Sequence, residues 1–342
     1  MIAHVCGVDR AIVAAVGRRF TAAVLRIERS GVAVFERAYG TLDDAPGARA
    51  TTVTTRFDLA SLTKIVVAHA ALDAVAASTL ALDASLEPWF PAWRGTAHES
   101  ITLRMLLAHT AGMQSGADYR TLFAENVEAY ALARALVARP GERVVYSDLG
   151  FIALGALLAR AHDASLRAVV ARSLARIGAT HADYRPRNDD RSTIPATEAD
   201  AWRGRVRGCV HDEKAYLMGG VAGHAGLFGT AADIARVADV YLAAATGRAT
   251  APLAREAIVE HGPDDVLRRG LGWALRTSDA NSCGSVASQQ TFGHTGFTGT
   301  CVWADPARDV SVVLLTNAVY YGRRDLRDLR AAVCDAAFGA FG

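Results

Sequence analysis

Strand-like segments stand at both ends of the 342-residue chain, while the stretch between them has a helical pattern. Near the start, residues 21–27 and 32–38 are rich in branched side chains and flank a short turn, which predicts a β-hairpin. Four more strand-like segments follow late in the chain, at 270–276, 291–295, 299–304 and 310–316. One sheet built from both chain ends, with a helical domain inserted between them, accounts for this order.

The helical segments set the expected domain boundaries. Apolar periodicity predicts helices at 61–77, 101–108, 126–137, 149–161, 166–177, 231–245 and 324–338, and the polar stretch 184–207 is typical of a long loop. We therefore expect a sheet-containing α/β domain from residues 1–75 and 206–342. Residues 76–205 would form the mainly helical domain, with the active site between the two.

Composition and charge argue against several classes of function. The net charge of +2 gives no sign of a nucleic-acid partner, and the longest apolar run, 149–159, is too short to span a membrane. Asp9 and Arg10 interrupt what would be the core of an export signal, so we expect a cytoplasmic location, or a periplasmic one if a leader was removed. The five cysteines show no C-x-x-C spacing, which indicates neither a disulfide framework nor a zinc site.

The segment Ser61-Leu62-Thr63-Lys64 carries the strongest chemical signal. At the start of a helix, residues three apart share a face, so the Ser61 hydroxyl and the Lys64 amine could meet. A lysine that loses its proton can activate a serine nucleophile, and the free N–H groups of the first helical turn can stabilise an oxyanion. Lys64 and Lys214 are the chain's two lysines, and lysine, unlike arginine, can act as a base. The structural alternative makes Ser61 an N-cap and Lys64 a solvated helix residue.

Two further segments offer groups that would complete such a site. Tyr146-Ser147-Asp148 precedes a predicted helix, where a phenol could relay a proton, although Ser147 or Asp148 could equally be an N-cap. The glycine-rich segment 293–299 lies on a predicted strand, and glycines there suggest that something approaches the backbone closely. A strand N–H could supply a second oxyanion donor, and His294 could bind substrate.

With these three motifs in order, the sequence resembles the serine β-lactamase and penicillin-binding protein superfamily. The resemblance is closest to its class C β-lactamase-like branch, which holds esterases, D-aminopeptidases and muropeptide amidases. It implies an α/β (α+β) fold of the β-lactamase/transpeptidase type, with an antiparallel sheet flanked by helices and an inserted all-helical domain. It also implies that Ser61 forms an acyl-enzyme while Lys64 and Tyr146 move protons. Backbone N–H groups of Ser61 and Phe297 would form the oxyanion hole.

The sequence departs from the family pattern at two positions. His294 stands where lysine is usual, ahead of Thr295 and Gly296, and an imidazole is a weaker anchor for a substrate carboxylate than an ammonium group. Asp148 stands where asparagine is usual, and an ionised carboxylate accepts hydrogen bonds but donates none. Asp148 could pair with Lys64 and hold it charged, or favour a substrate that carries an amine.

The glycine-rich stretch 210–228 lacks the spacing of a nucleotide-phosphate loop. It resembles a subgroup of cell-wall-recycling hydrolases that includes N-acetylmuramoyl-L-alanine amidases, and this places His211, Asp212 and His224 near the substrate rim. A zinc site from these residues is an open alternative, although their spacing is not a recognised ligand pattern. The expectation is that the protein uses no metal and no organic cofactor.

The expected function is hydrolysis of an ester or amide bond of a small molecule through a Ser61 acyl-enzyme. Substrate contacts are assigned to Asp148, His211 and His224, and to the segment His294-Thr295-Gly296. A muropeptide-like substrate fits the same interpretation, and the oligomeric state is not defined by the sequence. Two alternatives stay open: an acyltransferase that uses the same acyl-enzyme, and a non-catalytic domain that binds β-lactams or peptidoglycan fragments.

Overall fold

A six-stranded antiparallel sheet forms the base of the molecule. The computed structural model describes residues 2–116, 118–123, 125–263, 267–277 and 282–341. The sheet has the order β2-β1-β11-β10-β9-β8. Its strands are β1 (Ala22–Arg29), β2 (Val32–Gly40), β8 (Ala274–Leu275), β9 (Phe292–Thr295), β10 (Cys301–Asp305) and β11 (Val310–Thr316).

Both ends of the chain contribute to this sheet, as the sequence predicts. The first strand, β1, lies between its hairpin partner β2 and the last strand, β11, with Leu25 opposite Leu314. Along β11 the side chains alternate between two separate cores: Val312 and Leu314 belong to one, and Val313 and Leu315 to the other. This period of two is what a strand buried on both faces requires.

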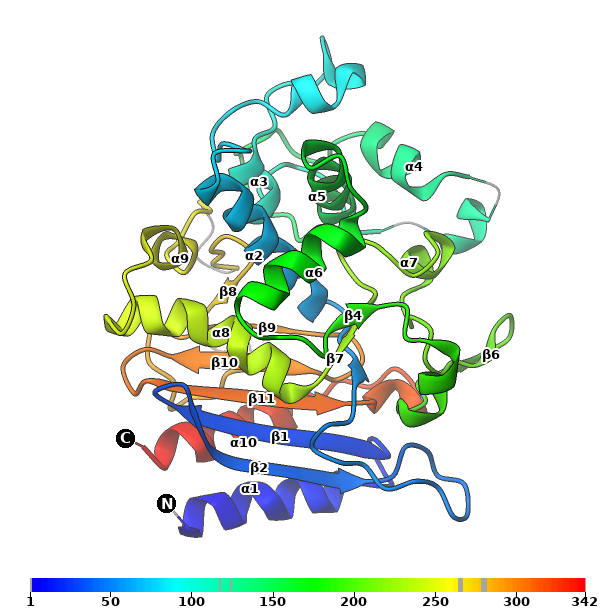
Figure 1. The fold of residues 1–342 in the computed structure, drawn as a ribbon, viewed down its shortest axis with the longest axis vertical. Coiled ribbons are helices and arrows are strands. Elements are labelled where there is room, and N and C mark those ends of the chain that lie inside the picture. The colour runs from blue at the N-terminus through cyan, green and yellow to red at the C-terminus, as the bar shows by residue number, and fades with distance from the viewer. Residues whose placement is uncertain (1, 117, 124, 264–266, 278–281, 342) are drawn as a thin grey trace.

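Helices cover both faces of the sheet (Figure 1). The terminal helices α1 (Ile2–Ala15) and α10 (Arg327–Gly339) pack together on one face. The opposite face carries α8 (Ala231–Thr246) and α2 (Leu62–Ala76), which join it to the helical region. The sequence analysis did not predict α1, although Val8, Ile12 and Ala15 are buried at helical spacing.

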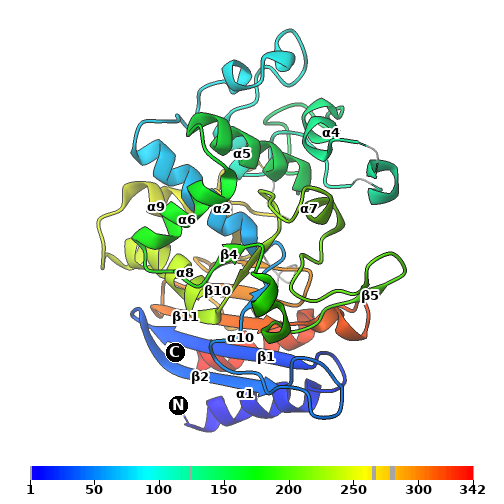
Figure 2. The ribbon, with the colours of Figure 1, turned by 45° about the vertical axis from the view of Figure 1, so that its right-hand side comes forward.

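The helical region stands above the sheet in both views (Figures 1 and 2). Its helices are α3 (Leu103–Leu107), α4 (Val127–Ala133), α5 (Asp148–Ala161) and α6 (Leu166–Arg176). Two short helices, α7 (Glu213–Leu217) and α9 (Pro252–Ala257), follow later in the chain. Short 3-10 helices lie at Glu87–Trp89, Pro91–Trp93, Tyr119–Leu122, Asn188–Thr193 and Ala318–Tyr321.

The expectation of an all-helical insertion needs one correction, because residues 76–205 also contain strands. The strand β4 (Asp183–Tyr184) pairs with β7 (Leu227–Gly229), which also pairs with β3 (Phe57–Asp58). The buried Tyr184 hydroxyl donates to the carbonyl of Ala222, which ties β4 to the glycine-rich loop. A small hairpin of β5 (Ala199–Asp200) and β6 (Gly204–Arg205) projects from the side of the molecule (Figure 2).

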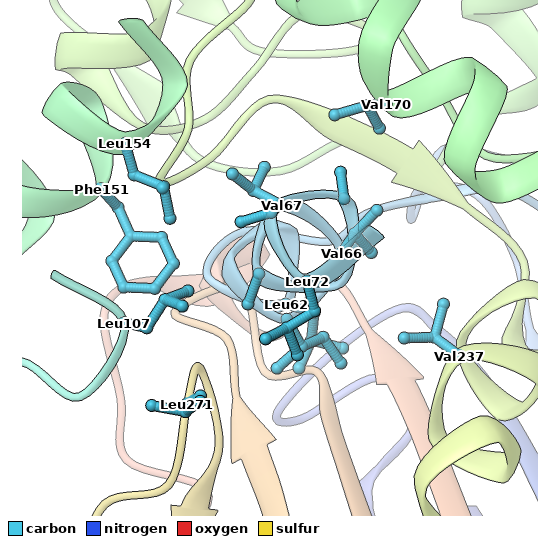
Figure 3. Packing of buried hydrophobic residues seen from close by; sticks show 14 of the residues in the cluster. Leu62, Val66, Val67, Leu72, Leu107, Phe151, Leu154, Val170, Val237 and Leu271 are labelled. Atoms are coloured by element: carbon cyan, nitrogen blue, oxygen red, sulfur yellow. The ribbon is translucent and has the colours of Figure 1, made fainter. Parts of the chain in front are cut away.

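Helix α2 is the central element of the larger core. Twelve of its fifteen residues are buried, so it is apolar on all sides rather than amphipathic. Figure 3 shows Leu62, Val66 and Val67 pointing outward from this helix toward surrounding side chains such as Phe151 and Val237. The first turn of α2 is therefore fixed by packing from every direction. Among the described residues, no single helix combines the length and apolar composition needed to cross a membrane; only the bent pair α5–α6 meets both criteria together.

Candidate active site

A strained turn places Ser61 at the start of α2. Ala60 has a left-handed backbone conformation, with φ of 46°, between β3 and the helix. The buried carboxylate of Asp58 holds this turn, since it accepts the N–H of Ala60 at 2.9 Å and that of His211 at 2.6 Å. The Ser61 side chain makes no capping hydrogen bond, so the interpretation of Ser61 as a side-chain N-cap is wrong. Its hydroxyl is left for another role.

The end of β9 lies directly against this turn. The hydroxyls of Thr298 and Thr300 donate to the carbonyls of Asp58 and Leu59, at 2.9 and 3.2 Å. A Cβ atom on Gly296 would lie 2.8 Å from the carbonyl oxygen of Leu59, so only glycine allows this approach. The glycine-rich segment therefore lets a strand of the sheet lie beside the serine.

Lys64 is fully buried and lies within hydrogen-bond distance of Ser61. Its Nζ donates to Ser61 Oγ at 3.0 Å, to Asp148 Oδ1 at 2.8 Å and to the carbonyl of His224 at 3.3 Å. Burial alone lowers the pKa of Lys64, but Asp148 and Tyr146 raise it by more, so the pKa ends above its ordinary value. The interpretation of Lys64 as a solvated residue is wrong. Lys64 is an ammonium ion in the resting site.

His109 holds the segment that carries Tyr146. Its carbonyl accepts the N–H of Val145 at 2.8 Å, and its Nδ1 accepts the N–H of Ser147 at 3.1 Å. The Tyr146 ring lies 4.7 Å from the His109 ring and 4.9 Å from Lys64 Nζ. Ser147 caps α5 by accepting the N–H of Gly150, which confirms the structural interpretation of this serine. Tyr146 is thereby fixed from both sides.

A cavity of about 600 Å³ opens beside Ser61. It brings together most of the predicted site residues: Ser61, Tyr146, His294, Thr295, Gly296 and Phe297. Within the described residues, neither the N–H of Ser61 nor that of Phe297 donates a hydrogen bond. Two free N–H groups beside one cavity are what an oxyanion hole needs, and that assignment stays a prediction.

Arginine side chains dominate the charge of this cavity. Within the part of the chain that the structure describes, its lining includes a single carboxylate, Asp325, and six arginines: Arg268, Arg269, Arg323, Arg324, Arg327 and Arg330. Arg269 lies closest to the reacting groups, with its Cζ 5.2 Å from the centre of the Tyr146 ring, and its Nε has no partner among the described residues. The cavity is therefore suited to a ligand with negative charge.

His294 contributes no charge to this cavity. Burial, with the charges of Arg269 and Lys64 nearby, lowers the pKa of His294 to about 3. Its Nδ1 donates to the carbonyl of Thr295 at 2.8 Å, which leaves Nε2 as an unpartnered acceptor. The imidazole can accept a hydrogen bond from a substrate N–H, but it cannot attract a carboxylate.

The remaining predicted substrate residues lie outside the cavity lining. His211 stacks on Phe297 and its Nε2 lies 2.6 Å from Glu198, while the His224 ring is buried against Asp212 at 2.8 Å. Asp148 binds Lys64 through one oxygen, and its other oxygen lies 3.2 Å from Lys214. A role for any of these three residues in binding substrate stays a prediction.

Asp148, Asp212 and His224 together offer three donor atoms within 4.8 Å of one another. However, both oxygens of Asp148 already bind lysine ammonium groups, and Asp212 Oδ1 accepts from His224 Nε2 and from the N–H of Ala215. A metal ion would have to displace these partners. The arrangement is an ion-pair network, and it differs from the zinc alternative because His211 is not a member.

Comparisons with known proteins fit this geometry. A family model described as Beta-lactamase matches residues 8–336. The chain belongs to the beta-lactamase family. A relative in Escherichia coli K12, named "Putative D-alanyl-D-alanine carboxypeptidase", is 30% identical over 341 aligned residues, which cover 86% of this chain and 77% of the relative. Membership of the beta-lactamase family confirms the expected fold and the expectation that the chain is an enzyme of the serine hydrolase type.

Solved structures of beta-lactamase-like proteins share the whole fold. A beta-lactamase/D-alanine carboxypeptidase from Pseudomonas syringae superposes with a TM-score of 0.77 at 20% identity and covers 98% of this chain and 99% of its own. A hydrolase with promiscuous acyltransferase activity gives a TM-score of 0.78 at 21% identity, covering 99% and 100%. At such identities the likeness concerns the fold alone.

Sequence reasoning missed three residues that the structure places at the site. Arg269 carries no local signal, and nothing in the sequence around His109 connects it to Tyr146, since each of the two lies more than twenty residues from the motif that it contacts. Lys214 had a signal, because it is one of two lysines in the chain, but nothing in its neighbourhood connected it to Lys64. Folding alone brings these side chains to the serine.

Proposed function

We propose that this enzyme cleaves peptide or amide bonds next to a free terminal carboxylate through a Ser61 acyl-enzyme, and hydrolyses simple esters by the same route. The observation that carries this proposal is the 3.0 Å contact of Lys64 Nζ with Ser61 Oγ beside an arginine-rich cavity. A nucleophile with an amine at this distance supports acyl transfer. The cavity charge supports an anionic substrate.

In the proposed reaction, the Lys64–Tyr146 pair first releases one proton to solvent. Ser61 Oγ then attacks the scissile carbonyl carbon, and its proton passes to the pair. The carbonyl oxygen, now negative, accepts hydrogen bonds from the N–H groups of Ser61 and Phe297. The pair then gives the proton to the leaving amine as the C–N bond breaks, which leaves the acyl-enzyme. Water repeats the sequence and releases the acid. Lys64 and Tyr146 are treated as a pair because Lys64 Nζ lies 4.9 Å from the centre of the Tyr146 ring.

The substrate carboxylate is assigned to Arg269. His294 stands where a lysine is usual, and its pKa of about 3 leaves it neutral. Arg269 supplies a fixed positive charge next to Tyr146 and has an N–H without a partner in the described part of the chain. The names of the relatives support the same substrate class, since they describe D-alanyl-D-alanine carboxypeptidases. A muropeptide-like peptide that ends in D-Ala-D-Ala is therefore the first substrate to test.

The test compares diacetyl-L-Lys-D-Ala-D-Ala with the same peptide carrying a C-terminal amide. Release of the C-terminal residue is measured, with p-nitrophenyl acetate and nitrocefin as reference substrates. We expect the free acid to be cleaved at least about tenfold faster in kcat/KM, since a paired charge contributes more than 1.4 kcal/mol when it is desolvated. Ser61→Ala should abolish turnover of every substrate.

Arg269→Gln serves as the matched variant for the carboxylate. It should lose the preference for the free acid while it keeps hydrolysis of p-nitrophenyl acetate, which has no carboxylate. Equal cleavage of acid and amide by the native enzyme would overturn the assigned substrate class. Turnover by Ser61→Ala would overturn the nucleophile, and an acyl product seen only with an added alcohol or amine would identify an acyltransferase instead.

A further inference from the structure

The two lysines of this chain meet at one carboxylate. The sequence has 37 basic residues, and Lys64 and Lys214 are the two that are not arginine. Asp148 Oδ1 lies 2.8 Å from Lys64 Nζ, and Asp148 Oδ2 lies 3.2 Å from Lys214 Nζ. The side chain of Lys64 is fully buried, and that of Lys214 is 12% exposed. Two groups that can exchange protons thus share one counter-ion away from solvent.

These contacts form a closed ring. From Lys214 the ring continues to Asp212 Oδ2 at 3.5 Å, and Asp212 Oδ1 lies 2.8 Å from His224 Nε2. The backbone carbonyl of His224 then accepts from Lys64 Nζ at 3.3 Å, which returns the ring to its start. Lys214 enters this ring from α7, on the short helix whose N-cap is Asp212.

We propose that Lys214 is a positioning residue for the reaction: by binding the second oxygen of Asp148, it limits the hold of that carboxylate on Lys64 and keeps the Lys64 proton exchangeable. The inference rests on the proposed roles of Ser61 and Lys64. Asp148 alone would hold the Lys64 proton up to a still higher pH, and a charged amine cannot take the serine proton. A second ammonium on the same carboxylate divides that attraction.

The sign of the effect does not depend on which group of the Lys64–Tyr146 pair is the base. A nearby positive charge makes either group release its proton at lower pH. The other groups that face Lys64 stay constant near neutral pH: His109 and His294 are neutral because burial lowers their pKa values, and Arg269 keeps its charge. The pKa of Asp212 is lowered, so this carboxylate stays ionised. Asp212 and His224 both act on Lys64 through the closed ring of contacts described above.

The experiment measures the pH dependence of the second-order rate at which a fluorophosphonate labels Ser61. Labelling by this probe reports the activation of the serine and needs no knowledge of the natural substrate. Lys214→Met should move the acid limb of this profile, the part in which the rate rises with pH, to higher pH by about one unit. Lys214→Arg keeps the charge, so its acid limb should lie at the same pH as that of the native enzyme. If Lys214 had a purely structural role, Lys214→Met would lower the rate without moving the limb.

A matched control removes a positive charge from the same region without touching Asp148. Arg185 is exposed and donates to the carbonyl of Gly219, just beyond α7, so Arg185→Met should leave the limb in place. In an Asp148→Asn background, Lys214→Met should shift the limb by less, because only the direct effect of the charge remains once the coupling through that carboxylate is removed. Thermal melting of each variant confirms folding.

Asp212→Asn tests the same idea with the opposite sign. It removes the other carboxylate that holds Lys214, so the acid limb should move to lower pH. If Lys214→Met does not fold, Asp212→Asn alone tests whether Lys214 acts on Lys64 through Asp148. An unmoved limb in both Lys214→Met and Asp212→Asn would overturn the inference and leave the proposed function intact. Labelling of Ser61→Ala at the native rate would instead overturn the function.

Discussion

At the scale of single residues, a fully buried charge is the feature that most needs an explanation. Lys64 has no exposed surface, and an isolated ammonium in that place would cost several kcal/mol. Asp148 offsets that cost; burial alone would raise the pKa of its carboxyl, but Lys64, His224 and Lys214 hold it well below the usual range. An asparagine at this position could accept a hydrogen bond from the same ammonium but would bring no negative charge to balance it. The departure from the family pattern thus has a structural reason.

His294 gives a prediction about acid stability. Its pKa is about 3 in the folded protein and near 6.5 in an unfolded chain, so between these values the unfolded state binds one proton more. Stability therefore falls as the pH decreases through this window, by about 1.4 kcal/mol per pH unit for this residue. Urea unfolding of His294→Gln at pH 6.5, 5.5 and 4.5 should show a slope smaller by that amount. An unchanged slope would mean that His294 is protonated in the folded state.

At the scale of elements, the glycine-rich loop is held against α5 by a backbone contact. A Cβ atom at Gly223 would lie 1.9 Å from the carbonyl oxygen of Phe151, so the loop carrying His224 cannot approach the helix with any other residue. Because the His224 carbonyl accepts from Lys64, this contact also positions the amine. Glycine at position 223 thus permits a close approach of two backbones.

Gly223→Ala should therefore destabilise the protein by about 3 kcal/mol, because the clash is with backbone that cannot rotate away. Gly116→Ala is the matched control, since a Cβ atom on Gly116 would have no described atom within 4 Å. This control should change the unfolding free energy by less than about 0.5 kcal/mol. Guanidinium unfolding measures both variants. Equal effects at the two glycines would show that the loop moves freely.

Local patterns predicted the existence of most elements but not their lengths, and tertiary contacts explain the difference. The predicted helix 126–137 ends at Ala133 because Trp93 Nε1 donates to the carbonyl of Leu132 and His98 contacts that of Arg134. The predicted strand 270–276 is reduced to Ala274–Leu275, since the N–H groups at its start bond to the carbonyls of Ala257 and Leu107. The periodicity of one segment carries no information about partners that lie far along the chain.

The same limit applies to the site. Ser61 and Lys64 are recognisable because their chemistry depends on short spacing, and Tyr146 is recognisable within its own motif; the structure brings the three residues together. His211 and His224 were placed near the substrate by a local resemblance, and that role stays a prediction; the structure adds that their side chains contact Glu198 and Asp212. The fold decides which group a polar side chain contacts. The sequence alone could therefore place these residues near the site but could not identify their partners.

At the scale of the whole molecule, Asn317 joins three distant parts of the chain. Its Oδ1 accepts the N–H groups of Thr21 and Ala22 at 3.0 Å each, and its Nδ2 donates to the Thr21 hydroxyl and to the carbonyl of Ala196. The side chain is almost fully buried at the end of β11. The first strand, the last strand and the inserted region therefore share one amide.

Asn317→Leu should lower the free energy of unfolding by at least about 3 kcal/mol, because it leaves several buried polar groups without partners. Asn126→Leu removes an asparagine that only caps α4 and should cost about 1 kcal/mol. Calorimetry should show that Asn317→Leu lowers the temperature of one transition for the whole protein. Two separated transitions would mean that the sheet and the inserted region unfold independently.

The clamp of Thr298 and Thr300 on the serine turn has a consequence for biosynthesis. These hydroxyls bind carbonyls that lie 240 and 241 residues earlier in the chain. A ribosome makes the nucleophile first, at about 5–20 residues per second, and the segment that completes its pocket follows about 240 residues later. In that interval the serine is an ordinary, unreactive hydroxyl, and its reactivity begins only once the later segment has been made and has folded onto the turn.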